Sequence, residues 1–136
     1  MIEAAKRATM PLVFVNRKSE VKREGQMANV GSDSAQSGKI QMEALAKSMN
    51  YRGNVAIVMG ALSNEEARER TRAVEEVIAT HKEMKVVEKQ SAKWQRNEAV
   101  DVVSGWLLNG PSINNDEMAI GAMMALKQAK KDTICF

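Results

Sequence analysis

Two hydrophobic patterns alternate along this chain. Short apolar runs occur at 11–15 and in the core of 54–60, an extended piece lies at 27–33, and a more polar run follows at 84–90. Continuous runs of this kind indicate strands that are covered on both faces, as in a parallel sheet. Because stretches with helical spacing separate the runs, the pattern predicts an α/β fold with parallel strands.

Between the runs, apolar residues recur every three or four positions, which is typical of amphipathic helices. A short helix is expected at 2–8, and a last helix begins near Asn115 or Asp116. Ser63-Asn64-Glu65-Glu66 has the S-x-x-E form of a capping box. The positions expected in the core are Gly38, Met42, Leu45, Ala46 and Met49; Ala67, Thr71, Val74, Val77 and Ile78; Ala99, Val102, Val103, Trp106 and Leu107; and Met118, Met123 and Met124.

Residues able to bind a ligand follow the ends of several predicted strands, where ligands bind in α/β proteins. Asn16 and Arg17 come directly after the first strand, and Arg68 lies in the first two turns of a helix, off its apolar stripe. Trp94 lies in a later strand-to-helix turn, and Asn115 precedes the last helix. Asparagine offers both donors and an acceptor, a guanidinium can hold two adjacent oxygens, and an indole can cover the C–H face of a sugar ring.

Each candidate also has a purely structural interpretation. Asn115 could simply cap its helix, and Arg68 could belong to a solvated helix face. Trp94 could be a packed loop anchor, and Asn16 and Arg17 could be an ordinary strand exit. Spacing alone favours the structural interpretation for Asn115 and Arg68 and leaves the others open.

Composition narrows the possible functions. The 136 residues are 44% hydrophobic and 27% charged, which suits one modest core. The 20 basic and 17 acidic residues are interspersed, so nucleic acid is not an expected partner. No run approaches the ~18 apolar residues that cross a membrane, so direct membrane insertion is not expected, and no export signal pattern follows Met1. With a single Cys135 and a single His81, we expect no metal or cofactor site and no Cys-His catalytic pair.

Taken together, the segments resemble the sugar-binding proteins of bacterial ABC importers, the ribose-type periplasmic binding proteins, and especially their inositol-binding relatives. By this resemblance, Asn16 and Arg17 match the cleft pair of the amino-terminal lobe. Arg68 matches the arginine that bonds ring hydroxyls, Trp94 the aromatic that stacks on the ring, and Asn115 the asparagine of the carboxyl-terminal lobe. The segments that carry the resemblance are Val13-Phe14-Val15-Asn16-Arg17, Val30-Gly31-Ser32-Asp33, Gly53-Asn54-Val55, Ala67-Arg68-Glu69-Arg70-Thr71, Lys93-Trp94-Gln95-Arg96 and Asn115-Asp116-Glu117-Met118-Ala119.

The resemblance implies a doubly wound parallel sheet in a two-lobe fold. Residues 1–32 would form a partial amino-terminal lobe and crossover, and residues 33–136 most of the carboxyl-terminal lobe, with a strand at 132–136. The lobes would close around a monosaccharide or cyclitol, and an ABC importer permease would recognise the closed form. A periplasmic or extracellular location follows by resemblance.

The chain departs from this family in ways that indicate an internal fragment. Family members are longer, and the connection at 109–114 is too short for the expected strand, with Pro111 unable to donate to a ladder. We therefore expect open sheet edges and marginal stability or self-association. The alternative function is the effector-binding lobe of a LacI-like regulator, which shares the fold. An enzyme is not expected, because G-x-S-x-G, P-loop and G-x-G-x-x-G motifs are absent.

Overall fold

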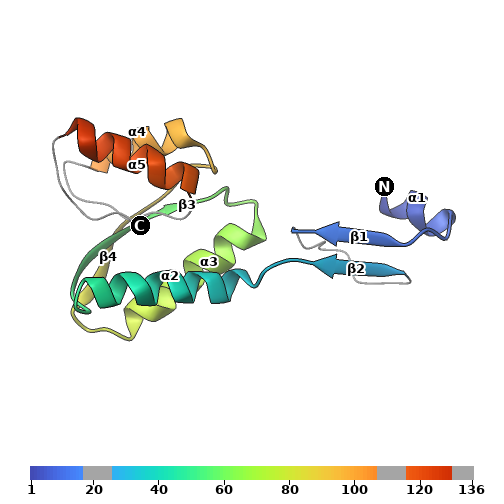
Figure 1. Cartoon of the computed structure of the whole chain (residues 1–136), viewed down its shortest axis with the longest axis horizontal. Helices are drawn as coiled ribbons and strands as arrows, with labels where there is room; N and C mark the ends of the chain where they lie inside the picture. Colours follow the sequence, from blue (N-terminus) through green and yellow to red (C-terminus); the bar gives the residue numbers. More distant parts are fainter. Residues whose placement is uncertain (17–25, 107–115, 130–136) are drawn as a thin grey trace. The chain divides into compact units, whose positions relative to one another are not determined.

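The computed structural model describes residues 1–16, 26–106 and 116–129 (Figure 1). The chain divides into two compact units, Met1–Asp33 and Ser34–Phe136. The elements in chain order are α1 (Ile2–Arg7), β1 (Leu12–Val15), β2 (Met27–Val30), α2 (Ser34–Ser48), β3 (Gly53–Met59), α3 (Glu65–Ala79), β4 (Met84–Ser91), α4 (Arg96–Trp106) and α5 (Asp116–Gln128). The predicted strand at 132–136 and the connection at 109–114 lie outside the described residues.

The first unit contains a two-stranded parallel sheet. Leu12 of β1 is opposite Met27 of β2, and Val15 is opposite Val30. The expectation that this apolar run is covered on both faces is wrong for the described residues. Val13, Val15 and Val30 are 54%, 72% and 61% exposed, because no described element of this unit packs on that face of the sheet.

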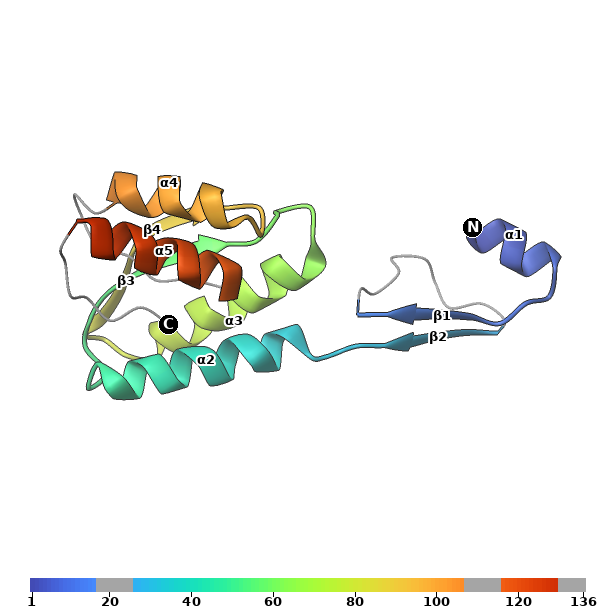
Figure 2. The ribbon, with the colours of Figure 1, turned by 45° about the horizontal axis from the view of Figure 1, so that its top comes forward.

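The second unit is built around β3, and here the expectation of a two-faced strand is confirmed. β3 pairs in parallel with β4, and α2 and α3 cover one face of the pair while α4 and α5 cover the other (Figures 1 and 2). Val55 and Ile57 pack into the cluster with α2 and α3, and Ala56 and Val58 into the cluster with α4 and α5. Alternate side chains therefore enter opposite cores, as a doubly wound sheet requires.

The helices of each pair pack closely because a glycine lies at each crossing. A Cβ on Gly38 of α2 would lie 2.5 Å from the carbonyl oxygen of Arg70 in α3. A Cβ on Gly121 of α5 would lie 2.4 Å from the carbonyl oxygen of Arg96 in α4. Neither position has room for a side chain, so the two crossings depend on glycine.

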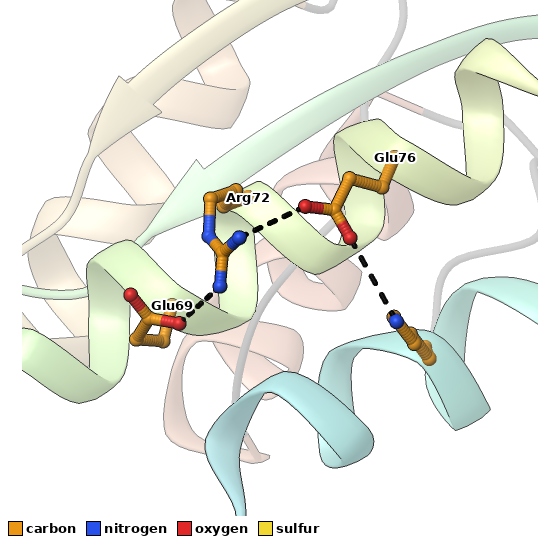
Figure 3. A network of polar contacts seen from close by, with 4 residues as sticks. Glu69, Arg72 and Glu76 are labelled. Atoms are coloured by element: carbon orange, nitrogen blue, oxygen red, sulfur yellow. Dashed lines mark hydrogen bonds and ion pairs between the residues drawn. The ribbon is translucent and has the colours of Figure 1, made fainter.

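The exposed side of the α2–α3 pair carries a network of charges (Figure 3). Arg72 donates to Glu69 over 2.6 Å and to Glu76 over 3.0 Å, and Lys39 of α2 lies 3.8 Å from the other oxygen of Glu76. Hydrogen bonding to Glu69, with the charges of both carboxylates, raises the pKa of Arg72 above its ordinary range. Such exposed pairs contribute little to stability, so this face is a solvated surface.

Two details of the helices differ from expectation. The N-cap of α3 is Asn64, whose side chain accepts a hydrogen bond from the backbone N–H of Glu66, so Ser63 does not form the predicted capping box. In α5, Met118 is buried, but Met123 and Met124 are 50% and 44% exposed. The prediction that all the methionines of α5 fill the core is wrong, because positions five and six beyond Met118 lie off its helical stripe.

The described part of the chain contains no helix long and apolar enough to cross a membrane. Across residues 1–16, 26–106 and 116–129, His, Cys, Asp and Glu form no group of three or more that could hold a metal ion.

Candidate functional site

The carboxyl ends of β3 and β4 lie at one edge of their sheet. Because the strands are parallel, the loops that lead to α3 and α4 both start at this edge, and the backbone N–H of Ala92 donates to the carbonyl of Met59 over 2.8 Å, which continues the pairing past the strand ends. Two of the predicted site residues, Arg68 and Trp94, belong to these loops and the helix that follows. The fold therefore brings both to the edge where α/β proteins bind ligands.

An unusual backbone turn carries Trp94. Lys93 and Trp94 both have left-handed backbone conformations, with φ of 51° and 66°. The N–H of Gln95 closes the turn on the carbonyl of Ala92 over 2.8 Å. Consecutive non-glycine residues in this region are strained, and such strain concentrates at functional sites and ligand clamps.

The indole of Trp94 lies against Gly60, the first residue after β3. A Cβ at position 60 would fall between 2.1 and 2.4 Å from three atoms of the six-membered ring. The ring also packs against the core cluster beside α4 and α5, yet the residue is only half-buried. Its Nε1 is buried and has no hydrogen-bond partner among the residues that the structure describes. Trp94 is therefore a packed anchor with part of its side chain still exposed.

Arg68 turns back toward the strand end. Its Nη1 donates to the carbonyl of Leu62 over 2.8 Å, in the loop between β3 and α3, and the side chain is exposed. Arg72, one turn later, instead joins Glu69 and Glu76 on the outer surface. Arg68 thus contacts the loop that begins at Gly60, which the indole of Trp94 also contacts.

The remaining predicted residues fall elsewhere. Asn16 lies exposed at the carboxyl end of β1 in the first unit, with a left-handed φ of 72°, and its N–H donates to the carbonyl of Val30 over 2.7 Å. Arg17 and Asn115 lie outside the described residues. Arg68 and Trp94 contact the same loop between β3 and α3, at Leu62 and Gly60, and Asn16 lies at the carboxyl end of its own parallel strand.

An ion pair that no sequence pattern indicates lies beside the candidate site. Arg96, in the first turn of α4, donates to both carboxylate oxygens of Glu117 in α5, over 2.7 and 2.9 Å. Hydrogen bonding from Arg96 is the main cause that lowers the pKa of Glu117, and the same bond raises the pKa of Arg96. The pair ties together the first turns of the two helices, and its 21-residue separation leaves no local sequence signal.

His81 lies at the opposite edge of this sheet. It precedes β4, and its ring lies 4.8 Å from that of Tyr51, which precedes β3. The only histidine of the chain is therefore at the amino ends of the strands and takes no part in the candidate site. What the site offers is an exposed guanidinium and a supported aromatic ring, which suit a neutral, hydroxyl-rich ring.

Comparison with known proteins finds matches over nearly the whole chain. A family model described as a periplasmic binding protein domain matches residues 1–136. A putative rhizopine-binding protein from Rhizobium meliloti is 40% identical over 139 residues, which cover 95% of this chain and 45% of that protein. A xylitol-binding protein from Mycolicibacterium smegmatis is 32% identical, with 94% of this chain and 38% of that protein covered.

A solved structure has the same fold. An ABC transporter solute binding protein from Bacillus halodurans with bound myo-inositol is 36% identical, with a TM-score of 0.90 over 98% of this chain and 49% of that chain. The superposition confirms the predicted α/β fold with parallel strands. The chain spans less than half the length of each of these three proteins.

Proposed function

The chain belongs to the periplasmic binding protein domain family, and from this premise we propose that it binds a monosaccharide or an inositol-like cyclitol between two lobes. The observation that carries the proposal is the convergence of Arg68 and Trp94 on the loop from Gly60 to Leu62, at the carboxyl edge of the β3–β4 sheet. Similarity to a protein with bound myo-inositol and to a rhizopine-binding protein supports a cyclitol as the first ligand to test.

Each residue has a role that its chemistry allows. Trp94 covers the apolar C–H face of the ring, and Arg68 donates to neighbouring hydroxyls. Asn115, directly before α5, supplies an amide that can both donate and accept. Asn16 and Arg17 contact the ligand from the other lobe, as the family resemblance implies. Binding energy from both lobes then favours the closed state.

We assign the chain to the solute-binding component of an ABC importer in the periplasm or outside the cell, with an ABC importer permease as its partner. The ligand is bound and released without bond making or breaking, so the site uses no cofactor, metal or catalytic residue. Nothing in the described residues favours the alternative of a LacI-like regulator.

The proposal is tested in a two-lobe protein that carries this sequence. Residues 1–136 replace the matching segment of the Bacillus halodurans protein, and titration calorimetry measures binding of myo-inositol, xylitol and ribose. We expect Arg68→Gln to weaken binding by about tenfold or more, because a hydrogen bond to a charged group contributes about 1.5–3 kcal/mol. Trp94→Ala should weaken binding by a similar factor, because it removes the apolar contact with the C–H face of the ring.

Arg72→Gln is the matched control, since Arg72 lies on the same helix but pairs with Glu69 and Glu76 on the outer face. It should leave the affinity unchanged. A folded chimaera that gives no heat with any of the three ligands would refute the proposed function. Equal losses in the Arg68 and Arg72 variants would remove Arg68 from the site.

A further inference from the structure

Gly60 and Ser91 hold the loop and the turn that support Trp94, and neither is among the residues proposed to contact the ligand. Gly60 provides the backbone surface on which the indole lies, and any side chain there would overlap the ring, at 2.1 Å from its nearest atom. Gly60 has no left-handed φ, so its lack of a side chain, and not its backbone freedom, is what the position requires.

Ser91, the last residue of β4, links the two loops. Its hydroxyl donates to the carbonyl of Gly60 over 2.7 Å and accepts a hydrogen bond from the N–H of Lys93 over 3.3 Å. Lys93 and Trp94 are the residues in left-handed conformations, so one hydroxyl holds both the strand end beneath the indole and the turn that carries it. Lys93 is further tied by its ammonium group to Glu98 of α4, over 3.1 Å.

We infer that Gly60 and Ser91 are positioning residues that set the plane of the Trp94 indole as a preformed platform for the ligand ring. This inference rests on the proposed function for the ligand itself, but the placement of the indole is a property of the chain alone. A stacking surface binds well only when its orientation is fixed before the ligand arrives, because ordering it on binding would reduce the affinity. The buried contact with Gly60 fixes one part of the ring, and the exposed part is left for the ligand.

The first experiment follows the indole directly in the full chain. The chain has two tryptophans, so Trp106→Phe leaves Trp94 as the single reporter, and circular dichroism confirms that each variant is folded. Gly60→Ala in this background should shift the emission of Trp94 to longer wavelength and increase its quenching by acrylamide, because the new methyl group pushes the ring toward solvent. Unchanged emission and quenching would overturn the inference.

The second experiment measures the affinity of the two-lobe chimaera for myo-inositol by calorimetry in a double-mutant cycle. Gly60→Ala should weaken binding by about tenfold in the parent chimaera, and by less than about twofold when Trp94 is already alanine, since the methyl group then has nothing to displace. A loss of the same size in both backgrounds would show that Gly60 acts without Trp94 and would overturn the inference.

The Ser91 variants keep the test decisive if Gly60→Ala does not fold. Ser91→Ala removes the hydroxyl and should shift the Trp94 emission in the same direction, while Ser91→Thr keeps the hydroxyl and should restore the parent spectrum. Equal spectra for the Ala and Thr variants would overturn the role of Ser91. If the parent chimaera binds no myo-inositol, the proposed function fails for this ligand, and the emission of Trp94 still decides whether Gly60 and Ser91 position the ring.

Discussion

The closest helix crossings give the sharpest stability prediction. Gly38 is buried in α2, where a Cβ would lie 2.5 Å from the carbonyl oxygen of Arg70 and 3.1 Å from the Cβ of Ala73. In Gly38→Ala, α2 and α3 would have to separate by about 0.9 Å to bring the first contact to the 3.4 Å of ordinary van der Waals packing. The contact that must yield is backbone, so a rotamer change cannot relieve it.

Two opposing effects decide the size of the loss. Overpacking of a close-packed region costs about 1–3 kcal/mol. Alanine in a helix interior gains about 1 kcal/mol over glycine. The net result for Gly38→Ala is a loss of about 1 kcal/mol in the free energy of unfolding. With a urea dependence of about 2 kcal/mol per molar, the midpoint of unfolding should fall by about 0.5 M.

Gly105 is the matched control. It is exposed in α4, and a Cβ there meets nothing within 4 Å. Gly105→Ala therefore gains only the higher helix propensity of alanine and should raise the free energy of unfolding by about 1 kcal/mol. Urea unfolding of both variants is followed by far-ultraviolet circular dichroism, which reports helix content. The reasoning is refuted if Gly38→Ala is as stable as the parent chain, or if both substitutions shift the midpoint in the same direction.

Three further predictions follow from single contacts. Asn64→Ala should lower the free energy of unfolding, measured by urea denaturation, by about 1 kcal/mol, while Ser63→Ala should be nearly neutral. A larger loss for Ser63→Ala than for Asn64→Ala would show that Ser63 forms the capping box after all. The pKa of Glu117 is lowered in the folded chain, so the stabilisation from its contact with Arg96 is present above the unfolded pKa and is lost as pH falls through the folded pKa. In an NMR titration, Arg96→Gln should raise the pKa of Glu117, and an unchanged value would contradict the assignment. Val15→Lys, at a residue that is 72% exposed on an apolar sheet face, should reduce self-association in sedimentation velocity, and a parent chain that is already monomeric would contradict this.

The doubly wound core was predictable because its signal is local. The unbroken apolar run at 55–59 indicates burial on both faces, and the apolar stripes of α2, α3 and α4 have helical spacing, so each pattern indicates its own environment. The cap of α3 could not be assigned as easily, because Ser63 and Asn64 are both good N-cap residues and only the path of the chain selects between them. The exposure of Val15 also lay beyond the sequence pattern, since a strand's own residues do not show what packs on it.

Residues at the candidate site were harder to predict for a related reason. Arg68 and Trp94 could be placed near strand ends from their positions in the chain, but the partners that orient them lie in the preceding loop and strand. Gly60 directly follows the predicted strand at 54–59 and Ser91 directly follows the one at 84–90, and no sequence pattern singled out either residue. The contact between Gly60 and the indole of Trp94 joins residues 34 positions apart in the chain, so no periodicity within either segment could reveal it.

In the structure, the two interpretations of Trp94 are compatible. From sequence, a packed loop anchor and a ligand platform were alternatives, yet the side chain is half-buried against Gly60 and the core beside α4 and α5. An indole free on both faces would change orientation, and fixing it on binding would reduce the affinity. Packing of one part of the ring is therefore the condition under which the other part can hold a ligand. The same reasoning applies to Arg68, whose hydrogen bond to Leu62 restricts a long side chain near the sheet edge. The contacts that anchor Trp94 and Arg68 are thus also the ones that would orient them for the proposed ligand.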